Sequence, residues 1–286
     1  MPGAASLNIG ALQRQLTTEF TGIGDRLVYL PTVESTNTLA MQLAFERPEE
    51  GLVVLTDSQT AGKGRQGHRW VDVYGYNILS SIVLRPGFPP HLLVMIASLA
   101  VVDSIIETCG VTATIKWPND VLIGERKVAG ILIETSRDPW GRMVAIVGIG
   151  INVNGHMQEL SQELASQASL IANATTLEIE CGHPISRETF IANLLRHIEH
   201  DYFALQQEAA GTNSVAKPPY GPFARLLRER WKGQLSTLGR TVSVQQGDSV
   251  ISGIAENVDE SGELLLRSLS GETVSITWGT LEYSAR

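Results

Sequence analysis

The chain has 286 residues, of which 43% are hydrophobic and 18% charged, and its formal net charge is −8 at pH 7. This composition predicts a globular protein with a substantial core, and the acidic balance argues against general binding to nucleic acid or to an anionic membrane surface. Its two cysteines, Cys109 and Cys181, are far apart in the sequence and predict reduced thiols. Without a signal peptide or an apolar run of about 18 residues, we expect a cytoplasmic protein with no membrane span.

The first half of the chain alternates between strand and helix patterns. We expect a short helix within residues 7–20, strands at 26–30, 52–56, 77–84 and 112–116, and a buried helix at 91–108. The polar run Glu34-Ser35-Thr36-Asn37 offers hydroxyl and amide groups that can cap a helix followed by an apolar pattern through residue 44.

The second half begins with a β-hairpin and ends in short strands. We expect hairpin strands at 121–123 and 128–136, a strand at 143–153, helices at 159–173, 187–207 and 223–231, a surface loop at 209–222, and strands at 241–245, 250–258, 263–269 and 273–278. These elements predict an α+β fold in three parts: an N-terminal extension (1–25), a mixed sheet with helices on one face (26–232) and a small β-barrel (233–286).

Residues 62–70 form a cationic, glycine-rich loop that reads Gly-Lys-Gly-Arg-Gln-Gly-His-Arg-Trp. Lys63, Arg65 and Arg69 repel one another unless an anion binds, so the loop favours a phosphate site over a plain surface turn. The spacing also matches the dinucleotide fingerprint, which requires a helix opening at Gly67. Glycine, aromatic residues and then a strand follow Gly67 instead, which argues against that class of site.

A second motif, Lys116-Trp117-Pro118-Asn119-Asp120, lies about fifty residues further on. Proline followed by Asn and Asp is a good turn between strands, which is its ordinary structural interpretation. Beside a phosphate loop, however, a side-chain amide can bind a nucleotide base. The two motifs together indicate an enzyme that uses a nucleotide.

These motifs occur in the order seen in biotin–protein ligases, which the sequence resembles over about residues 25–285. The matching segments are Glu34–Asn37, Gln59 with residues 61–70, residues 116–120, Arg126-Lys127-Val128-Ala129-Gly130-Ile131-Leu132-Ile133-Glu134, and Gly148-Ile149-Gly150-Ile151-Asn152. The resemblance implies a catalytic domain of the class II aminoacyl-tRNA-synthetase-like type and a C-terminal SH3-like barrel. It implies that biotin and ATP, with Mg²⁺, form biotinyl-5′-AMP, and that biotin then passes to a lysine of a biotin carboxyl carrier protein.

The same resemblance assigns roles to individual residues. The ureido ring of biotin would be hydrogen-bonded by Ser35, Thr36, Asn37 and Gln59. The ligand would lie along the backbone of Gly62, Lys63, Gly64 and Arg65, and its valeryl chain would approach Gly130, Gly148 and Gly150. The adenylate would contact Arg65, Arg69, Trp70, Lys116, Asn119, Lys127 and Asn152. Arg65 and Lys127 would be the catalytic residues.

The chemistry of the reaction fits these residue types. A carboxylate that attacks an α-phosphate brings two anions together, so fixed cations must face the forming bond. The guanidinium fork of Arg65 suits a phosphate, and the ammonium of Lys127 suits one shared oxygen. The three strand glycines also have an ordinary explanation, as bulges or close backbone contacts.

Two positions depart from the family pattern. Lys63 and His68 stand where arginines are usual, which leaves a phosphate contact by residue 68 in doubt. His197 and His200 share a helix face without a third ligand, so we expect no metal site there. Mg²⁺ is expected as the partner of ATP, with Asp120 only a guess as its contact.

Other functions compete with this interpretation. Lipoate or octanoate ligases share the general fold, but their pockets lack the pairing of the Ser-Thr-Asn run with residues 116–120. A biotin-sensing repressor would need an extra N-terminal DNA-binding domain, and residues 1–25 contain a single basic residue, Arg14. We therefore expect a monofunctional ligase that binds no nucleic acid; a homodimer stays open, as does an independent peptide-binding role for the C-terminal module.

Overall fold

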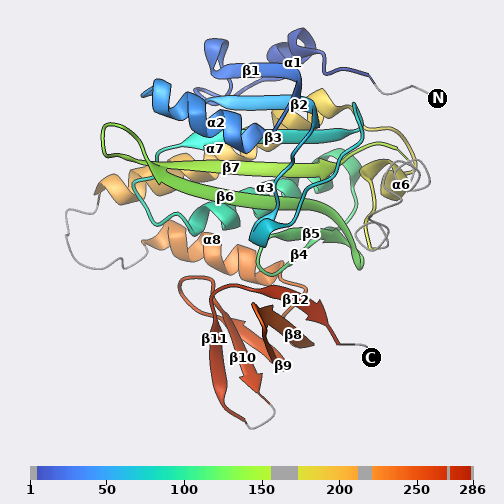
Figure 1. The fold of residues 1–286 in the computed structure, drawn as a ribbon, viewed down its shortest axis with the longest axis vertical. Helices are drawn as coiled ribbons and strands as arrows, with labels where there is room; N and C mark the ends of the chain where they lie inside the picture. Colours follow the sequence, from blue (N-terminus) through green and yellow to red (C-terminus); the bar gives the residue numbers. More distant parts are fainter. Residues whose placement is uncertain (1–4, 156–172, 212–220, 269–270, 285–286) are drawn as a thin grey trace.

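The computed structural model describes residues 5–155, 173–211, 221–268 and 271–284, and it has two β-sheets (Figure 1). The N-terminal part begins with α1 (Ile9–Gln15) and the 3₁₀ turn η1 (Gly24–Arg26). The larger sheet contains β1 (Leu27–Val33), β2 (Val53–Gln59), β3 (Asn77–Leu84), β4 (Thr114–Lys116), β5 (Asp120–Ile123), β6 (Arg126–Arg137) and β7 (Met143–Asn152). Its strand order is β1-β2-β3-β7-β6-β5-β4; β1 and β2 are parallel and the other neighbours antiparallel. The predicted mixed sheet is confirmed.

Helices cover both faces of this sheet, so the prediction of helices on one face is wrong. The helices are α2 (Thr36–Glu46), α3 (Leu92–Cys109), α6 (Leu177–Cys181), α7 (Arg187–Gly211) and α8 (Pro222–Gly233). Ala40 and Ala44 of α2 pack on the face that carries Val54 and Val83, in a cluster separate from the main core. β3 is buried along its whole length, as expected for a strand covered on both sides.

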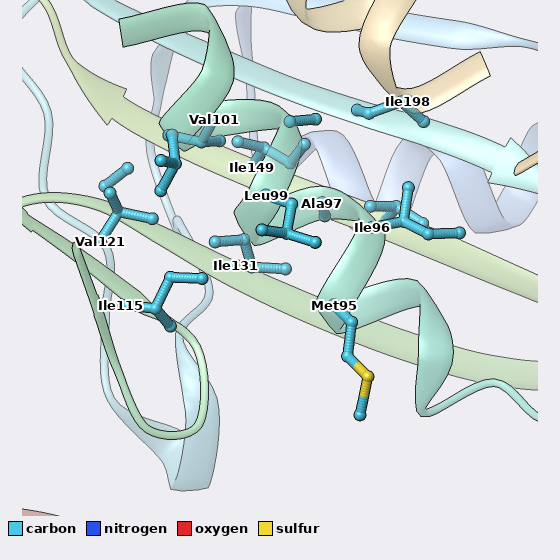
Figure 2. Close-up of a cluster of buried hydrophobic side chains, with 14 of the residues drawn as sticks. Met95, Ile96, Ala97, Leu99, Val101, Ile115, Val121, Ile131, Ile149 and Ile198 are labelled. Carbon is cyan, nitrogen blue, oxygen red and sulfur yellow. The ribbon is translucent and has the colours of Figure 1, made fainter. Parts of the chain in front are cut away.

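The main core lies on the opposite face, between the sheet and α3. In Figure 2, Leu99 and Val101 of α3 lie close to Ile131 of β6 and Ile149 of β7. All four side chains are buried, with exposed fractions of 2% or less. Such burial contributes about 1.5–3 kcal/mol for each large aliphatic side chain, so this layer holds β6 and β7 in place beneath the site described below.

The sequence expectation that the chain has no apolar run of about 18 residues needs correction at α3. Its 18 residues are apolar enough, by length and composition alone, to cross a membrane. Most of them are buried inside the fold, where α3 contacts the sheet, α7 and α8. Its apolar composition is therefore explained by its position as the central helix of the core.

The second sheet is antiparallel and consists of β8 (Thr241–Gln246), β9 (Ser249–Val258), β10 (Leu264–Ser268), β11 (Thr273–Ile276) and β12 (Thr280–Tyr283). Its order is β11-β10-β9-β8-β12, and within the described residues no pairing of β11 with β12 closes it. The separate C-terminal β unit is confirmed, whereas the predicted closed barrel is not found. The strand predicted at 273–278 is β11, which ends two residues earlier, and no strand was predicted at the position of β12.

Other element boundaries differ in smaller ways. The predicted loop 209–222 begins too early, because α7 continues to Gly211, and residues 212–220 lie outside the described part of the chain. The predicted helix at 159–173 also lies outside the described residues, except for its last residue. The strand predicted at 263–269 is β10, and residue 269 is likewise not described.

Candidate functional site

A cavity of about 280 Å³ opens where β6, β7, the glycine-rich loop, the turn at residues 117–120 and β12 meet. Most of the residues predicted for the site line it: Ser35, Thr36, Asn37, Gln59, Lys63, Gly64, Arg65, Arg69, Trp70, Lys116, Asn119, Lys127, Gly130, Gly148 and Gly150. Two predicted residues, Gly62 and Asn152, are not among its lining. The sequence motifs, which span more than a hundred residues, therefore converge on one cavity.

The start of α2 places three polar residues at one end of the cavity. Ser35 occupies the N-cap position, but its hydroxyl makes no capping bond. The side-chain oxygen of Gln59 accepts instead, from the backbone N–H of Thr36 at 2.8 Å and from the Thr36 hydroxyl at 3.1 Å. The predicted cap is thus supplied by β2, and the buried Ser35 hydroxyl is left to face the cavity.

A chain of hydrogen bonds continues from Thr36 across the pocket. The buried Ser81 hydroxyl lies 2.8 Å from Thr36 Oγ1 and 2.6 Å from Asn37 Oδ1. The Asn37 amide donates to Glu134 Oε2 at 2.7 Å, and the Lys63 ammonium lies 3.3 Å from Glu134 Oε1. Neither Ser81 nor Glu134 was predicted to act at the site; Glu134 lay inside a matched motif, while a serine in a buried strand carried no distinguishing signal.

The glycine-rich loop is a compact hairpin closed by its own backbone. Lys63 and Arg69 form an antiparallel bridge, and Gly64 N–H donates to His68 O at 2.8 Å. The 3₁₀ turn η2 (Arg65–Gly67) forms its tip, where Gln66 adopts a left-handed conformation with φ 54°. No α-helix opens at Gly67, which excludes the dinucleotide fingerprint, as predicted.

Trp70 ends the loop and lies flat on two strand glycines. A Cβ on Gly150 would lie 2.5 Å from Trp70 Cε2, and a Cβ on Gly130 would lie 3.1 Å from Cζ3. A Cβ on Gly148 would lie 2.2 Å from Asn37 Oδ1. These glycines therefore make room for the protein's own Trp70 and Asn37, which the sequence did not predict. The Trp70 indole N–H is buried and, within the described residues, has no hydrogen-bond partner.

The turn at residues 117–120 is anchored from two sides. Its Trp117–Pro118 bond is cis. Trp117 donates its indole N–H to Gly262 O at 2.9 Å and its backbone N–H to the Thr237 hydroxyl at 3.0 Å. Asn119 donates to Ile131 O at 2.7 Å, which turns its amide oxygen toward the guanidinium of Arg65 at 3.0 Å. The C-terminal sheet and β6 thus fix the turn that holds Arg65.

Lys127 reaches the cavity from β6 beside the same turn. Its ammonium lies 2.7 Å from Asp120 Oδ1 and 5.7 Å from the centre of the Trp70 ring. Its backbone N–H donates to Asn173 O at 2.7 Å, and its carbonyl accepts from Thr175 N–H at 2.9 Å. The ammonium is therefore held by Asp120, and the backbone of Lys127 is fixed through both its N–H and its carbonyl. Asp120, our guess for a Mg²⁺ contact, is the partner of Lys127.

Burial lowers the pKa of two cations in the cavity. The pKa of Arg65 is lowered by burial, with the negative charge of Asp120 acting against that shift. Burial likewise lowers the pKa of Lys116, again opposed by Asp120, and the Lys116 ammonium lies 5.2 Å from the centre of the Tyr283 ring. A dehydrated cation gains more from an incoming anion than a solvated one, so the cavity is suited to bind phosphate.

The C-terminal sheet also contributes to the cavity, which the sequence did not predict. Gly279, Thr280 and Leu281 line it. The Thr280 hydroxyl donates to the side-chain oxygen of Gln66 at 2.8 Å and so contacts the tip of the glycine-rich loop. The short linker at residues 231–238 favours docking of the C-terminal unit on the catalytic domain, but it does not indicate that this unit reaches the cavity.

The remaining candidates lie away from the cavity. Asn152 bonds to the Asn77 side chain at 3.2 Å and to Thr175 O at 3.1 Å. His197 lies 2.9 Å from Glu107, and His200 lies 2.9 Å from Asp201, so the two histidines have separate carboxylate partners. Across residues 5–155, 173–211, 221–268 and 271–284, no cluster of three or more His, Cys, Asp or Glu could hold a metal.

Two family models match the chain: the Biotin/lipoate A/B protein ligase family over residues 29–154 and the Biotin protein ligase C terminal domain over residues 237–280. A biotin–[acetyl-CoA-carboxylase] ligase from Paracoccus denitrificans is 33% identical over 254 residues, which cover 86% of this chain and 95% of that protein. A bifunctional ligase/repressor from Bacillus spizizenii is 31% identical over 253 residues, or 87% of this chain and 71% of the relative. The structure of a biotin protein ligase from Aquifex aeolicus in complex with biotin and ATP is similar with a TM-score of 0.71 and 26% identity, covering 90% of this chain and 98% of that one.

Proposed function

This chain belongs to the biotin protein ligase family, and from that premise we propose how its cavity joins biotin to ATP and passes the biotin on. It is an ATP-dependent biotin ligase. The assignment of the site rests on one observation: residues 35–37 at the start of α2, the glycine-rich loop and Lys127 all line the same cavity. A polar pocket beside a group of cations suits a neutral ureido ring at one end and a phosphate at the other.

The first half-reaction joins the two substrates. The biotin carboxylate attacks the α-phosphorus of ATP, a C–O–P anhydride bond forms, and pyrophosphate leaves. Arg65 and Lys127 approach this centre from different elements and stabilise the negative charge that gathers on the phosphate oxygens. Both already have partners, Asn119 and Asp120, which keep their charges aimed into the cavity before the substrates arrive.

The polar end of the cavity binds the biotin ring. Gln59 uses its amide oxygen to cap α2, so its amide nitrogen is the end it can offer to a ligand carbonyl. The Ser35 hydroxyl and the second amide hydrogen of Asn37 add further polar contacts. A few placed polar groups in a cavity that also has apolar walls, such as Leu79 and Ile149, are typical of a small-molecule site.

The adenine lies against Trp70, which the strand glycines already hold in a flat position. Mg²⁺ would enter with ATP and would be held mainly by phosphate oxygens and water, as is usual for this ion. Among the described residues that line the cavity, the one carboxylate, Asp120, is paired with Lys127, which fits a Mg²⁺ ion held mainly by the nucleotide.

In the second half-reaction a lysine amine of the acceptor attacks the carbonyl carbon of the mixed anhydride. An amide bond forms and AMP leaves. The acceptor is a carboxylase carrier domain, an inference supported by the names of the Paracoccus denitrificans and Mycobacterium tuberculosis relatives.

One experiment tests the assignment. The protein is incubated with ATP and Mg²⁺ and with either biotin or lipoate, and the acyl-adenylate is identified by mass spectrometry before and after a carrier domain is added. We expect biotinyl-AMP alone, and then a carrier domain heavier by one biotinyl group. An adenylate formed from lipoate in preference to biotin would contradict the proposal and favour the lipoate ligase alternative.

Several further features belong to the same proposal. We propose a cytoplasmic enzyme with no nucleic-acid or membrane partner, supported by the acidic charge balance. The class II synthetase-like relationship of the large sheet and the SH3-like relationship of the C-terminal sheet rest on the resemblance alone. A homodimer is a separate hypothesis, for which sedimentation with and without biotin is the direct test.

A further inference from the structure

Glu134 lies on β6 next to the polar end of the cavity, and its two carboxylate oxygens contact two different parts of the site. In the β6–β7 register it follows Leu132, which pairs with Gly148, and it pairs with Ile146. Alternation along the strand puts Leu132 and Glu134 on the same face. This is the face over which the start of α2 lies, because Asn37 reaches Glu134 from there.

One carboxylate oxygen determines how the Asn37 amide is oriented. An ionised carboxylate only accepts hydrogen bonds, so Asn37 must turn its NH₂ group toward Glu134 Oε2, at 2.7 Å. Its oxygen is then directed at the Ser81 hydroxyl, 2.6 Å away, and into the space that Gly148 leaves open. Without Glu134 the amide could flip, and its donor and acceptor would exchange places in the pocket.

The other oxygen holds the glycine-rich loop. Lys63 extends from the loop hairpin to Glu134 Oε1, at 3.3 Å. Lys63 and Glu134 are partly exposed, with side-chain accessibilities of 44% and 34%, so on its own this pair would contribute little. The same carboxylate, however, is fixed from the other side by Asn37, which is buried. The Lys63–Glu134 contact therefore links the glycine-rich loop to Asn37, whose amide faces the ring pocket.

We propose that Glu134 is a positioning residue that fixes the Asn37 amide for ring recognition and, through Lys63, tethers the glycine-rich loop over the occupied pocket. This inference rests on the proposed function, because the ring is that of biotin. Glu134 touches neither substrate in it; one oxygen acts through Asn37 on biotin affinity, and the other acts through Lys63 on the loop.

Three variants separate the two contacts. Glu134→Ala removes both. Glu134→Gln keeps a side-chain oxygen that can accept from Asn37 but removes the charge that faces Lys63. Lys63→Met removes only the ion pair. Glu256→Gln is the matched control, because Glu256 lies in another surface pair, 2.6 Å from Arg267, with accessibilities of 38% and 48%.

The first measurement is biotin affinity by calorimetry, together with the Michaelis constants of adenylate formation. We expect Glu134→Ala to weaken biotin binding by about tenfold to a hundredfold, the usual range for a hydrogen bond to a charged group. Glu134→Gln should recover about half of that loss on a logarithmic scale, because a neutral bond is roughly half as strong. The KM for ATP should change no more in Glu134→Gln than in Lys63→Met, because any effect on the nucleotide passes through the loop contact that both variants lose.

The second measurement is amide exchange across residues 62–70 with biotinyl-AMP bound. Glu134→Gln and Lys63→Met should accelerate exchange equally, whereas Glu256→Gln should match the wild type in both measurements. Thermal unfolding of each variant shows whether it is folded. If Glu134→Ala does not fold, the isosteric Glu134→Gln still tests the proposal.

The inference is overturned if Glu134→Ala binds biotin as tightly as the wild type, or if Glu134→Gln loses as much affinity as Glu134→Ala. It is also overturned if loop exchange is unchanged in Glu134→Gln. Failure of the proposed function looks different, because the wild type itself would then neither bind biotin nor form its adenylate.

Discussion

Replacing Gly150 by alanine tests the contact between the glycine-rich loop and the central strands. The new Cβ would lie 2.5 Å from Cε2 and 2.7 Å from Cζ2 of Trp70. Carbon atoms pack at about 3.5–4.0 Å, so the indole or the strand must move by roughly 1 Å. Overpacking of this kind costs about 1–3 kcal/mol. Gly130→Ala, with its closest approach at 3.1 Å, should cost less.

Urea unfolding of four proteins measures this cost: wild type, Gly150→Ala, Trp70→Ala and the double variant. Because the clash needs the indole ring, Gly150→Ala should cost about 1–3 kcal/mol when Trp70 is present and under about 0.5 kcal/mol in the Trp70→Ala background. Gly233→Ala is the control, since a Cβ at Gly233 meets nothing within 4 Å. If the two single effects simply add, Trp70 does not rest on β7 in solution, and the geometry drawn for the adenine site is wrong.

The remaining predictions concern a thiol and the loop. Burial, with the Cys181 thiol beside it, raises the pKa of Cys109 to about 12 from its ordinary value of 9.0. The thiolate is the reactive form, so iodoacetamide at pH 8.5 should alkylate Cys109 up to about a thousandfold more slowly in the folded protein than in urea; equal rates would refute the burial argument. Between pH 9 and 12 the unfolded thiol is ionised while the folded one stays protonated, so this group lowers the stability as the pH rises. Amide exchange across residues 60–70 should slow more with biotinyl-AMP than with biotin alone, because only the adenylate supplies an anion for the cations and a base for Trp70; protection already complete without ligand would exclude gating.

Sequence patterns predicted the elements well where the signal is local. The strand predicted at 77–84 is β3, and the apolar helix predicted at 91–108 is α3 within one residue at each end. Glycine spacing and aromatic residues after Gly67 were enough to exclude a dinucleotide fold. These features depend on neighbours in the chain, which the sequence displays directly.

The features that escaped prediction depend on partners far away in the sequence. Gln59 caps α2 from the end of β2, and Glu134 contacts Asn37, which lies 97 positions away in the sequence. The strand glycines were expected to make room for the ligand, whereas Gly150 makes room for the indole ring of Trp70. The second covered face of the sheet was missed because the residue pattern of a strand does not say which distant element packs on each side; in the structure β3 is buried throughout.

The central claim is that this cavity, with Lys127 at its cationic end, is where biotin and ATP react. Biotin-dependent release of pyrophosphate, measured for the wild type and for Lys127→Ala, tests it most directly. Loss of a charge that stabilises the transition state costs roughly 3–4 kcal/mol, so the variant should be slower by a few hundredfold or more while its thermal unfolding is unchanged. A folded Lys127→Ala variant that releases pyrophosphate at a nearly normal rate would contradict the claim.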